Sequence, residues 1–103
     1  MDENQFANRL AQLRTLKGIS ARDMSLSIGQ AHAYINMIEN GKMLPSFSAF
    51  FYICDYLGVT PMEFFDVETE NPTELREIME DMKKLNIQQR QAVAAMVREL
   101  VKK

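Results

Sequence analysis

The chain has 103 residues, an apolar share of 47% and a charged share of 25%. This length and composition indicate one ordinary globular domain, or one small domain with an appendage, and exclude a disordered chain. Twelve basic and 14 acidic residues give a net charge of −2, which excludes the overall basic excess common in strong nucleic-acid binders. Any affinity for nucleic acid must therefore come from where individual cations lie.

No apolar run approaches the roughly 18 residues that a membrane-spanning helix needs, and no basic and apolar leader precedes the first polar stretch. The single cysteine, Cys54, cannot form an internal disulfide, which is typical of a reduced, cytoplasmic setting. The only histidine, His32, is separated from Cys54 by 21 residues, so we expect neither a metal site nor a cofactor. We expect a cytoplasmic protein without membrane contact.

The first predicted helix covers residues 4–17. Apolar residues recur on one face at Phe6, Leu10, Leu13 and Leu16, and Gly18 is a typical residue to end the helix. Either Asp2 or Asn4 provides the side chain that caps its start.

Two short helices are predicted next, over residues 21–28 and 31–39, with Gly29 between them. Ser20 caps the first of these, and Asn40-Gly41 ends the second as a turn. Ile35 and Ile38 are expected to point inward in the second helix. Two helices joined by a short, glycine-containing turn are typical of the helix-turn-helix unit, whose second helix enters a DNA groove.

A fourth helix is predicted over residues 47–57, after Ser46 as its cap, and a fifth begins at Pro61 and ends near residue 65. Thr60 and Glu63 form a capping box for the fifth helix, which has Pro61 at its first position. The simplest interpretation of the nearby aromatic cluster is core packing, with Phe47 partly exposed; its other members are Phe50, Phe51, Phe64 and Phe65.

Residues 67–71 are polar and acidic and are predicted to be a linker, so residues 1–66 form the first domain. Pro72 begins a sixth helix, and Asn86 caps a seventh that reaches about residue 101. One continuous helix is the alternative, because Asn86 is a weak break signal. The apolar stripes of residues 72–103 predict a homodimer built from this segment, while folding back onto the first domain is the other option.

No stretch of the chain alternates in the manner of a β-strand. The expected fold class is therefore all-α, with five helices in residues 1–66 followed by a C-terminal helical hairpin. No phosphate-cradling glycine loop, carboxylate dyad or Ser/His/Asp set is present, so we expect no catalytic residues and no enzyme.

Several separated motifs resemble the lambda-repressor/Cro-like helix-turn-helix family, also called the XRE family. They are R-L-x-x-L-R-x-x-K-G-I-S from residue 9, I-x-x-I-E-N-G-K from residue 35, P-S at residue 45, and L-G-V-T-P-x-E-F-F from residue 57. The resemblance covers about residues 6–65. It implies a five-helix DNA-binding domain of a transcriptional regulator, usually a dimer on a two-fold operator.

The resemblance also implies roles for individual positions. It makes residues 31–39 the recognition helix and gives the base-contacting positions as His32, Ala33, Asn36 and Met37. It gives the positions at the DNA backbone as Ala21, Gln30, Tyr34, Asn40, Lys42 and Met43. In the family, the positions of Arg14 and Glu39 form a partly buried ion pair.

Chemistry supports part of this assignment. Asn36 can bond to adenine through N6 and N7, and Met37 and Ala33 offer apolar contact to a thymine methyl group. This sequence departs from the family pattern at Ala21, usually Gln, and at Ala31, usually a Ser or Thr cap. We expect a DNA-binding regulator, a dimeric repressor on double-stranded DNA. The alternative is a protein-interaction adaptor or antitoxin-like module with a protein partner and weak or no DNA binding.

Overall fold

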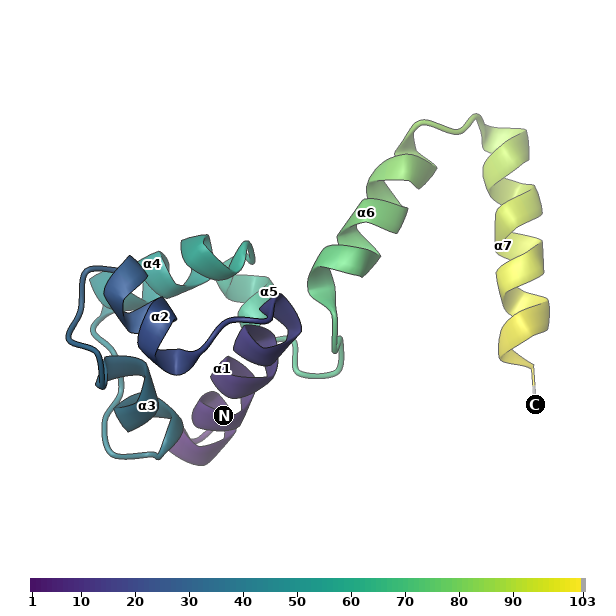
Figure 1. The fold of residues 1–103 in the computed structure, drawn as a ribbon. Coiled ribbons are helices and arrows are strands. Elements are labelled where there is room, and N and C mark those ends of the chain that lie inside the picture. The colour runs from purple at the N-terminus through teal and green to yellow at the C-terminus, as the bar shows by residue number, and fades with distance from the viewer. Residues whose placement is uncertain (103) are drawn as a thin grey trace. The chain divides into compact units, whose positions relative to one another are not determined.

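The computed structural model describes residues 1–102, which form seven helices and no strand (Figure 1). The helices are α1 (Glu3–Lys17), α2 (Ala21–Ser27), α3 (Tyr34–Glu39), α4 (Phe47–Leu57), α5 (Pro61–Phe65), α6 (Pro72–Lys83) and α7 (Ile87–Val101). The all-α fold class predicted from the sequence is confirmed. The chain divides into two compact units, one covering Met1–Pro72 and the other beginning at Thr73.

Local side chains explain where most of these helices begin. Asp2 caps α1, Ser20 caps α2 and Ser46 caps α4, each by accepting from the backbone N–H three residues later. Thr60 with Glu63, and Asn86 with Gln89, form complete capping boxes at α5 and α7. These caps satisfy N–H groups that have no partner inside the helix, so short sequence motifs fix the helix starts.

The core of the first unit lies between α1 and the four following helices. α1 packs against α3, α4 and α5, while α2 packs against α3. The rings of Phe6, Phe50 and Phe64 lie 4.9 to 5.7 Å apart between centroids and form the aromatic centre. The buried apolar cluster as a whole consists of Phe6, Leu10, Leu13, Met24, Ile35, Ile38, Phe50, Ile53, Cys54, Leu57, Val59 and Phe64.

Several sequence expectations about this unit are wrong. Leu16 and Phe51 are each 53% exposed and Phe65 is 48% exposed, so none belongs to the core. In the continuous apolar run around Phe51, helical periodicity alone does not decide which of two neighbouring phenylalanines faces inward. Conversely, Arg9 is buried at 2% exposure although it is charged.

The third helix begins three residues later than predicted, at Tyr34 instead of residue 31. Residues 31–33 form a turn in which Ala31 O accepts from Tyr34 N at 3.0 Å. A Ser or Thr at position 31 would supply a side-chain oxygen that caps the first turn, and alanine has none.

The second unit contains α6 and α7, which are two helices and not one continuous helix (Figure 1). Arg90 on α7 donates from Nε to Met82 O at 3.1 Å and from Nη2 to Lys83 O at 3.3 Å, so it covers the end of α6. None of the residues of α7 is buried, and in α6 only Pro72 is. Polar bonds form at the turn of this hairpin, while most of its large apolar side chains stay exposed.

Candidate nucleic-acid interface

The turn between α2 and α3 is held by two backbone bonds. Gly29 N donates to Leu26 O at 3.1 Å, and Gln30 N donates to Ser25 O at 2.9 Å. This pair of bonds is the Schellman arrangement, in which the residue after the helix cap adopts a left-handed conformation. Gly29 has φ +78°, which glycine adopts without steric penalty. The sequence therefore fixes a tight reversal between the two helices.

α3 has one buried face and one exposed face. Ile35 and Ile38 are 0% and 1% exposed, which seats the helix on α1 and α2. Asn36 and Met37 lie between them in sequence and are exposed, and His32 is exposed in the turn before the helix. Ala33, at the N-cap position, is half-buried. α3 and the turn before it thus expose an amide, a thioether and an imidazole within six residues.

An ion pair fixes the C-terminal end of α3 to α1. Arg14 donates from Nε to Glu39 Oε2 at 2.7 Å and from Nη2 to Glu39 Oε1 at 2.9 Å, so the contact is bidentate. Its Nη1 also donates to Ile19 O at 2.8 Å. The hydrogen bond to Glu39 raises the pKa of Arg14, while burial opposes that shift. One guanidinium therefore joins α1, α3 and the turn that precedes α2.

The segment after α3 turns sharply at Gly41, with φ +73°. Gly41 N donates to Ile38 O and Lys42 N to Met37 O, both at 3.0 Å, again in the Schellman arrangement. A Cβ at position 41 would also lie 3.4 Å from Asn4 Oδ1. This turn leaves Asn40 and Lys42 exposed directly beyond the end of α3.

The other four positions expected at the DNA backbone are less accessible. Ala21, Gln30, Tyr34 and Met43 are half-buried, and all of them except Gln30 pack against the core. Burial raises the pKa of Tyr34, so its hydroxyl remains a protonated donor at neutral pH. Apart from Gln30, these positions offer backbone groups and one hydroxyl rather than long polar side chains.

Sequence reasoning passed over two residues of this region. Arg22 is an exposed cation in the first turn of α2, beside Ala21, and could have been found as the only basic residue of that helix. Ser25 is fully buried on α2, and its hydroxyl accepts from Ile35 N on α3 at 2.9 Å. No local motif points to that bond, since the two residues are ten positions apart.

Few cations remain available for a polyanion. Residues 1–66 contain five Lys or Arg side chains. Arg9 is buried, Arg14 is paired with Glu39, and the Lys17 ammonium lies 5.5 Å from the centroid of the Tyr56 ring. Lys17, Arg22 and Lys42 are exposed; of these, Arg22 lies in the first turn of α2 and Lys42 directly after α3.

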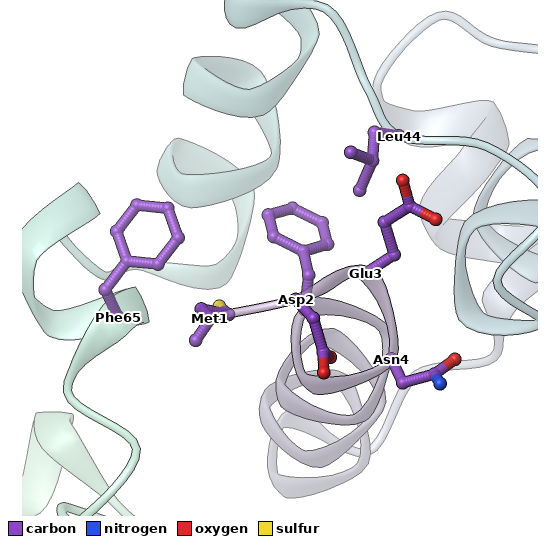
Figure 2. Close-up of a pocket in the computed structure, with 7 residues that line it drawn as sticks. Met1, Asp2, Glu3, Asn4, Leu44 and Phe65 are labelled. Carbon is purple, nitrogen blue, oxygen red and sulfur yellow. The ribbon is translucent and has the colours of Figure 1, made fainter.

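Other parts of the described chain offer little chemistry. A hollow of about 550 Å³ lies at the start of α1, and Met1, Leu44 and Phe65 are among the residues that line it (Figure 2). The carboxylate of Asp2 at its edge already accepts from Gln5 N at 2.8 Å as the cap of α1. Burial raises the pKa of Cys54 to about 11, which keeps the thiol protonated and unreactive at neutral pH.

Within residues 1–102, no three His, Cys, Asp or Glu side chains gather as a metal site. No helix in that range is long and apolar enough to cross a membrane.

Comparisons with known proteins agree with the helix-turn-helix arrangement of α2 and α3. Residues 10–64 match the helix-turn-helix family model. Among solved structures, the restriction-modification controller protein C.AhdI from Aeromonas hydrophila is similar, with a TM-score of 0.59 and 30% sequence identity. The match covers 62% of this chain and 93% of that protein. A comparison with curated proteins gives no match.

Proposed function

We propose, because the chain belongs to the XRE family of helix-turn-helix DNA-binding regulators, that it is a dimeric repressor of a two-fold operator. Two copies of α3 would enter successive major grooves on one face of the duplex, about 34–36 Å apart. In each copy, the segment from His32 to Met37 would meet the base edges. Arg22, Asn40 and Lys42 would meet the phosphates. The identity to a restriction-modification controller protein supports a regulatory role.

The observation that carries this proposal is the exposed face of α3. Ile35 and Ile38 are buried and Glu39 is held by Arg14, so the helix is fixed while Asn36 and Met37 remain uncovered. A rigid helix with exposed side chains on its first turns is the arrangement that reaches base edges in helix-turn-helix proteins. Asn36 would bond to adenine, and Met37 with Ala33 would contact a thymine methyl group.

Selection of bound DNA from a random pool tests the proposal directly. We expect a two-fold motif whose half-sites lie about one helical turn apart. With the selected operator in hand, Asn36→Ala should relax the preference at one base pair by about 1–3 kcal/mol. Lys42→Ala should weaken all sequences alike, because a phosphate contact carries no base preference. Full operator affinity in both variants would contradict this docking.

A protein-interaction module is the second candidate, and three exposed aromatic side chains of α4 favour it. Phe47 is 84% exposed, Tyr52 is 62% exposed and Phe51 is 53% exposed, on a unit that carries few free cations. Large exposed apolar patches are typical of interaction sites. Retention on heparin at low salt, together with a gel shift on random DNA, separates the two candidates. A protein that shows neither property would be an interaction module.

The dimer is proposed to form through residues 72–103. Leu75, Ile78 and Met79 on α6 are 44–54% exposed, and Leu100 on α7 is 78% exposed. Two short helices without a buried core are not stable alone in water, since helical stability in proteins comes mainly from packing of the apolar face. A second copy of the segment, related by a two-fold axis, would cover both stripes at once.

A further inference from the structure

One buried oxygen atom connects the two helices of the motif. Ser25 on α2 is 0% exposed. Its hydroxyl donates to Ala21 O within α2 at 2.7 Å and accepts from Ile35 N on α3 at 2.9 Å. Both hydrogen-bonding roles of the hydroxyl are thus used, and the donated bond orients its lone pair toward α3.

α3 lacks the local cap that the other helices of the first unit have. Its N-cap residue, Ala33, makes no side-chain hydrogen bond, whereas Asp2, Ser20, Ser46 and Thr60 cap their own helices. The first N–H groups of a helix have no partner inside it, and a buried N–H without a partner is unfavourable. Ile35 is the second residue of α3, so its N–H is one of these groups.

Ser25 also holds the chain between the helices. Its backbone carbonyl accepts from Gln30 N at 2.9 Å, which closes the turn at Gly29. The same residue therefore fixes the end of α2 through its carbonyl and the start of α3 through its hydroxyl. Asn36 follows Ile35 directly, so the position of the Ile35 backbone sets where the Asn36 side chain begins.

We propose that Ser25 is a positioning residue: its hydroxyl replaces the missing local cap of α3 and sets the placement of the side chains that read DNA. The effect of Ser25 on base recognition rests on the proposed DNA-binding function, while its role as a helix cap does not. Ser25 touches no DNA in this scheme and acts only through the backbone of Ile35.

The cap is tested on the full chain without DNA, by amide hydrogen exchange of Ser25→Ala and Ser25→Cys. Alanine removes the hydroxyl, and cysteine fills the space with a sulfur that is a weak acceptor. In both variants the Ile35 amide should exchange at least about tenfold faster, because a buried N–H loses its acceptor. The Phe50 amide, which donates to Ser46 O at 2.8 Å on α4, is the internal reference for a general loss of stability.

Ser27→Ala is the matched control, since Ser27 is exposed on the same helix. In the Ser27→Ala variant, the Ile35 amide should exchange at the same rate as in the unaltered protein. If Ile35 and Phe50 accelerate equally in the Ser25 variants, the effect is a general loss of stability and the cap is overturned. An unchanged Ile35 amide overturns it as well.

The role in reading is tested by the ratio of affinities for the selected operator and for random DNA. We expect Ser25→Ala to lower this ratio roughly tenfold, while Ser27→Ala leaves it unchanged. If the affinity ratio is unchanged while the Ile35 amide exchanges faster, the positioning role is overturned and Ser25 acts only as a helix cap. If the unaltered protein shows no operator preference, the proposed function and the role in reading both fail, and the exchange result still decides the cap.

Discussion

At the scale of single residues, the buried charge of Arg9 holds the end of α5 against α1. Its Nε donates to Phe64 O at 2.7 Å, and its Nη2 donates to Glu63 O at 2.8 Å and Asp66 O at 2.9 Å. Burial lowers the pKa of Arg9, and the charge of Asp66 opposes that shift. The guanidinium thus donates to three backbone carbonyls at the C-terminal end of α5, where helix carbonyls lack partners in the next turn.

Replacing Arg9 with methionine should destabilise the first unit by about 2–4 kcal/mol, because the aliphatic stem is kept while buried carbonyls lose their donor. Urea unfolding monitored by circular dichroism measures this difference. Arg22→Met is the matched control: it removes an exposed arginine and should change stability by less than about 0.5 kcal/mol. Equal losses in the two variants would mean that the carbonyl contacts of Arg9 contribute nothing.

At the scale of elements, local signals decided which helices could be predicted. Ser46, Thr60 and Asn86 cap the residues that directly follow them, so those helix starts could be read from the sequence. The bonds from Ile35 N to Ser25 Oγ and from Arg9 Nε to Phe64 O join residues 10 and 55 positions apart, and no local pattern reveals them.

The exposed face of α3 could be inferred from the spacing of Ile35 and Ile38, but its first residue could not. Its first turn has no side-chain cap of its own, and the hydroxyl that accepts from Ile35 N belongs to Ser25, ten positions earlier. The aromatic run in α4 posed a different difficulty. Phe50 and Phe51 are chemically identical neighbours, and only the placement of α1 and α5 decides which of them is buried.

Ala31→Ser should lengthen α3 toward residue 31 and raise stability by about 1 kcal/mol, because the hydroxyl supplies a cap for the first turn. Slower exchange of the backbone amides of residues 33 and 34, together with a higher urea midpoint, would register the change. Ala33→Ser is the control, since ψ of 1° at this position is far from the extended geometry of a capping residue. Stabilisation by Ala33→Ser alone would contradict this account of the helix start.

At the scale of the whole molecule, the second unit differs from the first because no residue of its helix α7 is buried. If it forms the proposed dimer, Leu100→Glu should convert the dimer to a monomer, because a charge would replace the most exposed apolar residue of the stripe. Gln91→Glu adds the same charge on the opposite side of α7 and should leave the dimer intact. Sedimentation velocity measures the oligomeric state of both variants. An unaltered chain that is monomeric at high micromolar concentration would refute the dimer.

The number of exposed cations near α2 and α3 predicts how steeply operator affinity falls with salt. With Arg22 and Lys42 from each of two copies at phosphates, the slope of log affinity against log salt should be near −3.6, or about −0.9 for each neutralised phosphate. Titrations of the operator between 50 and 200 mM salt would give this slope. A slope steeper than about −6 would require phosphate contacts from cations outside the motif.

Because Arg9 is buried and Arg14 is paired with Glu39, neither attracts DNA, and this affects the rate of association. Residues 1–66 carry five basic and seven acidic side chains, so this unit exerts no long-range attraction on a polyanion. Encounter with the operator would then proceed near the unsteered rate of about 10⁵–10⁶ M⁻¹s⁻¹, and weak non-specific binding leaves little opportunity to slide along the duplex. Such a regulator locates its target by repeated collisions from solution, and the time to occupy the operator is set directly by the protein's concentration.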